Sequence, residues 1–395
     1  MIAAMFTLLA VLTLAGLLGP LLAFGRRGLV PAVVGQLLAG AVLGRTGFGV
    51  VDPSVQPLPA FSALGFAMLM FSAGTHVDIG SREIREGFIR GLAAFGVVIV
   101  TAAPIALLLD RALLPGRAPL LAVIIAGSSA AIAFPIIDER GLRGPAISLL
   151  IAWVAIADSV TVILMPLTLT GAGNVVSAIL GDAAIVAAGV LVLVIGERVR
   201  RSGASTQVRE RSIARAWALQ ERLAVLLLLG LSAIAERTGA STLVAGFLAG
   251  MILVRLREPG RVALQLSGIA NGFFVPLFFV LLGAQLNLRA LLMQPSRIGL
   301  ALALLAAAVV THVIAASIAG GSRRVATGLA ASAQLGMPAA AASLGLSSGV
   351  LGPADAAALV AAGCLTLIPA TAGALLLARG GVRAPSAAMD GRRTP

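Results

Sequence analysis

The chain is a series of long apolar runs separated by short polar gaps. A helix that spans the hydrocarbon core of a bilayer needs about 20 mainly apolar residues, or fewer where it is broken or re-entrant. Thirteen runs meet this requirement: 4–24, 29–45, 61–77, 88–110, 119–137, 146–169, 174–196, 218–235, 241–256, 269–288, 297–319, 325–347 and 355–378. The pattern predicts an all-α membrane protein with about 13 transmembrane helices.

The composition agrees with a chain surrounded by lipid. Hydrophobic residues make up 59% of its 395 residues and charged residues 11%, whereas a soluble domain carries about 25% charged residues. The net charge of +13 comes from arginines in the gaps between runs, and only 4% of residues are aromatic. This pattern indicates membrane topology rather than a nucleic-acid partner. A single cysteine and two histidines argue against disulfides and a structural metal, and no cofactor is expected.

The flanks of the runs predict the orientation. No basic residue precedes the first run, while Arg26 and Arg27 follow it, as expected for a retained span with its N-terminus outside. With this orientation most arginines fall inside, including those of the polar loop 197–217. We therefore expect one membrane domain over 1–379 of a cell (inner) membrane protein, N-terminus outside and C-terminus cytoplasmic. The tail 380–395 is rich in Pro, Gly and Arg and is expected to be disordered.

Two pairs of segments indicate an internal repeat. The segment from Leu38 to Arg45 resembles that from Leu248 to Arg255, and the segment from Leu69 to Asp78 resembles that from Phe278 to Asn287. The two members of each pair fall in spans of opposite direction. The sequence therefore predicts two inverted-topology repeats, about 29–169 and 241–378, as in many secondary transporters.

One apolar run in each repeat is interrupted by Gly and Pro. The first runs from Gly127 to Pro135 and the second from Ser332 to Pro338. Proline removes a backbone donor and clashes with the preceding turn, so we predict crossed discontinuous helices, whose free carbonyls and N–H groups can serve ions. An ordinary kink without a function is the alternative. The predicted break residues are Pro135, Gln334, Gly336 and Pro338.

Two ionisable side chains lie deep in the predicted spans. Asp158 lies near the middle of the run 146–169, where an ionisable group costs about 2.5–3.5 kcal/mol on insertion scales and is rare unless functional. His312 lies near the inner end of the run 297–319. The alternatives are a structural, hydrogen-bonded acid for Asp158 and a quietly hydrogen-bonded imidazole for His312. Asp158 is the candidate ion- and proton-binding group.

These features resemble the monovalent cation:proton antiporter superfamily, which includes sodium/hydrogen exchangers and potassium-efflux-type antiporters. The Gly-rich stretch from Pro31 to Gly44 resembles the family's early helix. The stretch from Ser128 to Gly141 resembles its first crossing helix, and Phe273 to Gly283 its Phe-rich helix. Asp158 falls where the family carries its essential carboxylate.

Four positions depart from the family pattern. Ala157 stands where relatives usually have Asp, Asn or Gln, and His312 where they have Lys or Arg. Ser128 and Ser129 replace a Thr-Asp or Ser-Thr pair. These departures leave one carboxylate at the predicted ion site.

The resemblance implies exchange of Na⁺ or K⁺ for protons by an elevator-like movement, and a homodimer with contacts from spans one, eight and nine. Burial disfavours the charged carboxylate, so a proton and a cation compete for Asp158. Further ligands are expected from the hydroxyls of Ser128, Ser129, Ser159 or Thr161 and from carbonyls of the broken helices, with His312 as modulator or charge partner. One carboxylate favours one-for-one, electroneutral exchange.

Other functions remain open from the sequence. A sodium-coupled or anion carrier on the same scaffold would need a second polar cluster at the midplane. A non-transporting sensor or subunit is compatible with the departures at Ala157 and His312. No Gly-rich phosphate loop, nucleophile elbow or metal-binding His/Glu motif appears, so we do not expect an enzyme.

Overall fold

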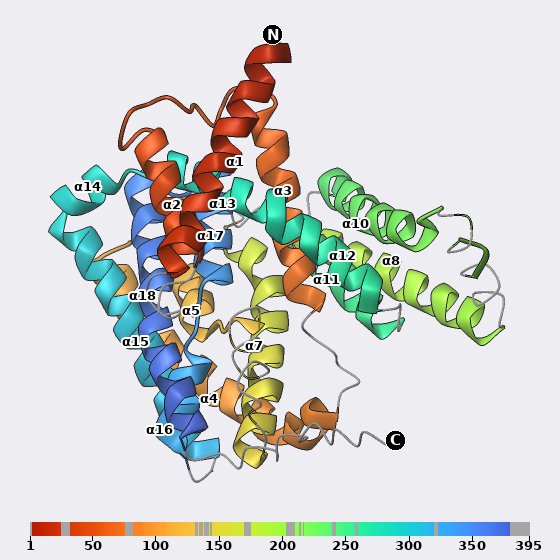
Figure 1. Cartoon of the computed structure of the whole chain (residues 1–395). Helices are drawn as coiled ribbons and strands as arrows, with labels where there is room; N and C mark the ends of the chain where they lie inside the picture. The colour runs from red at the N-terminus through yellow and green to blue at the C-terminus, as the bar shows by residue number, and fades with distance from the viewer. Residues whose placement is uncertain are drawn as a thin grey trace, which may run out of the picture.

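The computed structural model is built of α-helices (Figure 1). It describes residues 2–24, 32–75, 82–130, 133, 137, 142, 144–169, 175–202, 210–212, 215, 217–238, 242–256, 260–319 and 323–379, and no β-strand occurs among them. In chain order the elements are α1 (Ile2–Phe24), α2 (Ala32–Leu43), α3 (Leu58–Thr75), α4 (Arg82–Ala112), α5 (Ala118–Ala126), α7 (Pro145–Leu169), α8 (Val175–Arg201), α10 (Leu219–Thr238), α11 (Thr242–Arg255), α12 (Gly260–Ile269), the π-helix η2 (Ala270–Phe274), α13 (Val275–Gln285), α14 (Leu288–Met293), α15 (Pro295–Ala319), α16 (Arg324–Ala331), α17 (Gly336–Ser347) and α18 (Pro353–Ala378).

Each predicted apolar run overlaps a helix. Within the described part of the chain, eight helical stretches are long and apolar enough to cross a membrane: α3, most of α4, α7, most of α8, α12 to α13, α15, α16 with α17, and α18. Shorter apolar stretches lie in α1, α2 and α11. An all-helical membrane fold is thus confirmed, while the number of thirteen crossings stays a prediction.

Two predicted spans differ from the observed helices. The run predicted at 269–288 belongs to a longer helical stretch that begins at Gly260 and passes through the π-turn of η2. The run predicted at 119–137 is interrupted, because α5 ends at Ala126. Pro135 and the tail 380–395 lie outside the described residues.

The helices pack in two groups. In the first, α4, α5, α7, α15, α16, α17 and α18 contact one another; in the second, α1, α2, α3, α8, α10, α11, α12, η2 and α13 do so. Figure 1 shows α8 and α10 extending to one side of the molecule, away from α15 and α18. Contacts of α11 and α8 with α7 join the groups. We refer to the first as the core group and to the second as the panel group.

Close helix contacts in the panel group depend on glycine. A Cβ added to Gly40 of α2 would overlap the carbonyl of Val280 in α13, and one added to Gly283 of α13 would overlap the carbonyl of Leu37 in α2. The same reciprocal contact occurs between α3 and α11. A Cβ added to Gly74 of α3 would overlap the carbonyl of Phe247 in α11, and one added to Gly250 of α11 would overlap the carbonyl of Phe71 in α3. Small residues let backbones approach closely where lipid gives no hydrophobic drive for helix association. The two helix pairs therefore pack in the same way.

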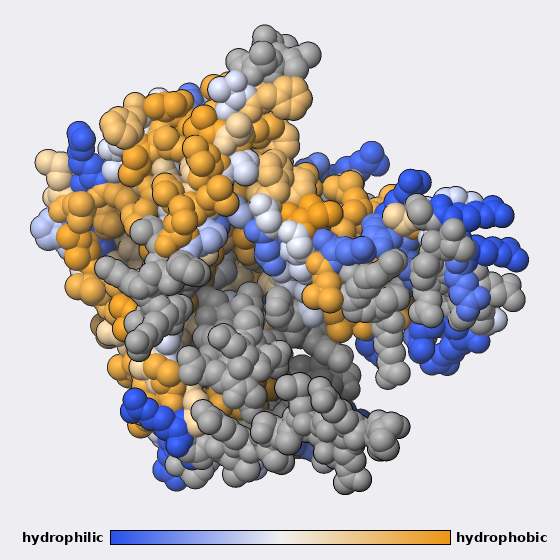
Figure 2. All heavy atoms as spheres, in the orientation of Figure 1, coloured by the Kyte–Doolittle hydropathy of each residue, from blue (hydrophilic) through white to orange (hydrophobic). Residues whose placement is uncertain are grey.

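Large apolar side chains cover the outside of the helices. Phe6 of α1, Ile89 and Val100 of α4, and Leu191 of α8 are largely exposed, as expected for surfaces that face lipid. Figure 2 shows hydrophobic residues over α1, α2 and α15, while hydrophilic residues gather at the far ends of α8 and α10. This distribution agrees with a band of lipid contact bordered by polar helix ends.

Candidate functional site

The first helix break lies at the end of α5. After Ala126 the backbone becomes extended, with φ −66° and ψ 154° at Gly127, and Ser128 and Ser129 continue without helical structure. Both serines are buried. The helical conformation returns at Ala130, so the break exposes backbone N–H groups at its far side.

Asp158 lies at this break. It is on α7, only 5% exposed, and its Oδ2 accepts a hydrogen bond of 3.1 Å from the backbone N–H of Ala130. An N–H at a helix start carries partial positive charge and stabilises a carboxylate. The structure therefore places Asp158 beside the first broken helix, in contact with a backbone N–H of the segment that follows the break.

The second break lies between α16 and α17. Helix α16 ends at Ala331, and α17 begins at Gly336, which places Gln334 within the break. Pro338 is in the first turn of α17, where a missing N–H costs nothing because that N–H has no helical partner. The break thus lies ahead of this proline rather than at it.

The hydrogen bonds of the second break resemble those of the first. The backbone N–H of Gln334 donates to Oγ1 of Thr366 in α18 at 3.0 Å. Thr366 also donates to the carbonyl of Gly363 at 2.7 Å. Thr366 was not among the predicted site residues, because a threonine that bonds its own helix is common in apolar spans. Thr366 follows Asp158 by 208 residues (366 − 158), close to the 210 (248 − 38) that separate Leu38 from Leu248 in the predicted repeat, and this spacing is the signal that could have identified it.

Side chains of the two breaks also bond directly to each other's helices. The Ser128 hydroxyl donates to the carbonyl of Ala331, the last residue of α16. In return, Nε2 of Gln334 donates to the carbonyls of Ile125 at 2.9 Å and Gly127 at 2.8 Å. The structure therefore brings Ser128 and Gln334 together at one crossing, next to the Ala130–Asp158 contact.

Two predicted ligands point to their own helix. The Ser159 hydroxyl donates to the carbonyl of Ala155, and the Thr161 hydroxyl donates to that of Ala157, both at 2.7 Å. Each oxygen keeps lone pairs that can accept a cation, but its proton is already used. No bond among the described residues links either hydroxyl to the side chain of Asp158.

His312 is fully buried on α15. Its ring stacks on that of Trp153 in α7, with centroids 5.3 Å apart and planes at 14°. Its Nδ1 lies 2.8 Å from the carbonyl of Ala308. In the part of the chain that the structure describes, no ion pair joins His312 to Asp158. His312 therefore contacts the aromatic neighbour of the site rather than its carboxylate.

The chemistry of this arrangement is that of one buried oxygen acid at a crossing of two broken helices. Among the described residues, no group of three or more His, Cys, Asp or Glu side chains could hold a metal ion. A carboxylate with carbonyl and hydroxyl oxygens nearby suits a proton or a hard monovalent cation.

Comparisons with known proteins agree with this chemistry. A family model described as "Sodium/hydrogen exchanger, transmembrane" matches residues 10–378. The putative Na⁺/H⁺ antiporter YjbQ of Bacillus subtilis (strain 168) is 28% identical over 324 residues, which cover 78% of this chain and 52% of that protein. The glutathione-regulated potassium-efflux system protein KefC of Escherichia coli (strain K12) is 26% identical over 276 residues, covering 68% of this chain and 43% of that protein.

A solved structure shares the fold. The sodium proton antiporter MjNhaP1 from Methanocaldococcus jannaschii aligns with a TM-score of 0.64 at 17% identity, over 95% of this chain and 99% of that one. The chain spans about half the length of the curated relatives it matches. Because the family model covers nearly all of the membrane region, this chain belongs to the sodium/hydrogen exchanger family.

Proposed function

We propose that the protein is a secondary active antiporter that exchanges a monovalent cation, Na⁺ or K⁺, for protons at Asp158. The observation that carries the proposal is the contact between the buried carboxylate of Asp158 and the N–H of Ala130 at the first helix break. The names of the relatives, a Na⁺/H⁺ antiporter and a potassium-efflux protein, support both cations as substrates.

One site serves both ions because they compete for the same oxygens. A carboxylate removed from water favours its neutral, protonated form. A cation replaces the proton when oxygen ligands surround it, and the hydroxyls of Ser128, Ser129, Ser159 and Thr161 lie on the two segments that meet at Asp158. Since Asp158 carries one negative charge, one proton leaves for each monovalent cation that binds, and the exchange is electroneutral.

Two inverted repeats explain the paired contacts of the molecule. In each half, a backbone N–H at a helix break bonds to a side chain on the next long helix, Asp158 in one case and Thr366 in the other. The glycine contacts of α2 with α13 match those of α11 with α3. In addition, α1 packs on α2 and α13 as α10 packs on α11 and α3. These matches support repeats that also include α1 and α10.

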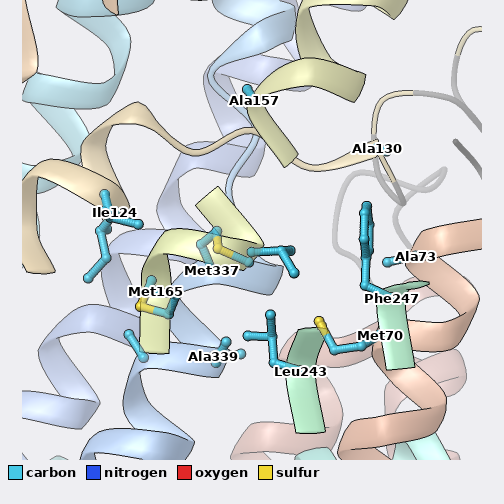
Figure 3. Close-up of a cluster of buried hydrophobic side chains, with 14 of the residues drawn as sticks. Met70, Ala73, Ile124, Ala130, Ala157, Met165, Leu243, Phe247, Met337 and Ala339 are labelled. Carbon is cyan, nitrogen blue, oxygen red and sulfur yellow. The ribbon is translucent and has the colours of Figure 1, made fainter. Parts of the chain in front are cut away.

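Movement of the core group along the panel group would give the alternating access of an elevator mechanism. Asp158 and both breaks belong to the core group. Figure 3 shows an apolar seam between the groups, with Met165 and Ala339 on the core side and Leu243 and Met70 on the panel side. All four are buried. Apolar contacts of this kind, with adaptable methionines, permit sliding of one group along the other.

The remaining proposals concern placement in the cell. We place the protein in the cell membrane with its N-terminus outside, following the distribution of arginines. A homodimer with contacts from α1, α10 and α11 fits the exposed apolar residues of α1 and α10, such as Leu14 and Leu226.

The experiment is exchange in proteoliposomes that contain a pH-sensitive dye. Adding sodium or potassium outside acid-loaded vesicles should dissipate the pH gradient, and Asp158→Asn should abolish this response. Competition also requires the apparent KM for the cation to rise as the pH falls. A wild-type protein that exchanges neither cation would reject the proposal and favour a non-transporting role. Exchange that persists in Asp158→Asn would reject Asp158 as the binding group.

A further inference from the structure

The side chain of Gln334 is held in one orientation. It is 3% exposed, and its terminal nitrogen lies within 2.9 Å of the carbonyl oxygens of Ile125 and Gly127. Both carbonyls can only accept hydrogen bonds, so the amide must direct its two N–H groups to them and its oxygen away. Gln334 therefore caps the last turn of α5 from the opposite repeat.

These two carbonyls are the groups that a helix break makes available to cations. Carbonyls at a helix C-terminus lack intrahelical partners and carry partial negative charge. Unwound carbonyls of this kind coordinate the ion in transporters with discontinuous helices. Here the positive edge of the Gln334 amide occupies the place that a cation would take.

The cap has a smaller counterpart on the other helix. The Ser128 hydroxyl donates to the carbonyl of Ala331 at the end of α16. Each break thus supplies a side chain that caps the helix of the other break. The two N–H groups opposite, from Ala130 and Gln334, bond to Asp158 and Thr366. The negative helix ends are therefore covered by neutral donors, and of the four side chains Ser128, Gln334, Asp158 and Thr366 only Asp158 is ionisable.

We propose that Gln334 is a specificity-determining residue, whose amide excludes the α5 carbonyls from cation binding and confines the cation to Asp158 and its hydroxyl neighbours. This inference rests on the proposed antiport. With those carbonyls occupied, the bound cation keeps more of its water, because fewer protein oxygens replace the hydration shell. The attraction between the site and a partly hydrated cation depends on the charge of the cation more than on its radius, so the site discriminates weakly between sodium and potassium.

The test removes the cap while keeping its volume. In Gln334→Met the carbonyls of Ile125 and Gly127 lose the amide that donates to them and become available to a cation. We expect the affinity for one of the two cations to increase, so that the ratio of sodium to potassium affinity changes by about fivefold. This factor corresponds to the free energy of one hydrogen bond. Gln334→Asn keeps an amide that is one methylene too short and should act in the same direction. Affinity is read from the melting temperature of the purified protein in sodium and potassium series, and again from exchange in proteoliposomes.

A second variant tests the direction of the amide. Gln334→Glu is equal in size, but its carboxyl can donate to a carbonyl only when protonated. Exchange by this variant should shift toward acid pH relative to wild type, which a purely space-filling role would not produce. Ser332→Ala is the matched control, since its hydroxyl lies in the same break and donates to the carbonyl of Leu329 in the preceding helix. It should leave the ratio of affinities unchanged.

The outcomes separate this inference from the proposed function. If both Gln334→Met and Gln334→Asn bind sodium and potassium in the wild-type ratio, or if Gln334→Glu keeps the wild-type pH profile, Gln334 is only a structural cap and the inference is overturned. If the wild type shows neither exchange nor stabilisation by either cation, the proposed antiport fails instead.

Discussion

Asp158 and Thr366 occupy matching places in the molecule. Each lies on the long helix that follows a broken one, and each accepts a backbone N–H from that break, at 3.1 Å and 3.0 Å. One place holds a carboxyl group and the other a hydroxyl. Of these two matching groups, only the carboxyl of Asp158 can exchange a proton for a cation, and the proposed charge balance of transport rests on this difference.

Exchange is predicted to be electroneutral for this reason. Because potassium is itself a proposed substrate, the potential is imposed with a gradient of a permeant anion such as thiocyanate, and the rate of sodium uptake into proteoliposomes should not change. Rates that increase when the interior is made negative would contradict one-for-one exchange. Thr366→Asp adds a second carboxyl at the matching place, and any exchange it retains should depend on the imposed potential.

Variants of Asp158 should separate its structural role from its transport role. Asparagine keeps an oxygen that can accept from Ala130, whereas alanine leaves that buried N–H without a partner. An unsatisfied buried group costs about 1–3 kcal/mol, so Asp158→Ala should melt at a lower temperature than Asp158→Asn, while both variants lose exchange. Equal melting temperatures would show that the contact with Ala130 contributes nothing to stability.

The sequence predicted the helices, the buried position of Asp158 and the two helix breaks, but not the hydrogen bonds that join the breaks. Apolar runs and a lone acid are local features that require no knowledge of packing. The partner of Ser128 lies 203 residues away, and those of Gln334 lie 207 and 209 residues away. No local pattern encodes contacts of that separation, so Gln334 was predicted only as a break residue and Thr366 was missed.

The position of the second break illustrates the same limit. Proline was predicted to mark the break, yet Pro338 lies in the first turn of α17. Proline is favoured there because it has no N–H to satisfy. A proline in an apolar run is thus compatible with a break before it as well as a kink at it, and the hydrogen bonds of the neighbouring helices decide between the two.

Glycines at the helix contacts of the panel group are predicted to tolerate no side chain. A Cβ at Gly40 or at Gly250 would overlap a carbonyl of the facing helix, and overpacking of this kind costs about 1–3 kcal/mol. Gly40→Ala and Gly250→Ala should lower the melting temperature by similar amounts, because their surroundings match. Gly230→Ala is the control: nothing lies within 4 Å of its Cβ position, and alanine is favoured over glycine in a helix by about 1 kcal/mol. Equal effects at all three positions would refute the matched packing.

The ring of His312 is predicted to act by stacking rather than by charge. It packs on Trp153 and forms no ion pair with Asp158 among the described residues. His312→Phe keeps a flat ring of similar size and loses the polar contacts of the imidazole, among them the bond to Ala308, which is worth about 1 kcal/mol. We expect it to retain exchange with an unchanged pH profile.

His312→Ala should instead remove the face that supports Trp153 and leave a cavity, which costs about 3 kcal/mol when a large buried ring is lost. Its melting temperature should fall well below that of His312→Phe. Melting curves and exchange measured over a range of pH test both variants. A His312→Phe protein that folds normally but loses exchange, or whose pH profile moves, would assign the imidazole a role in proton transfer that stacking alone does not explain.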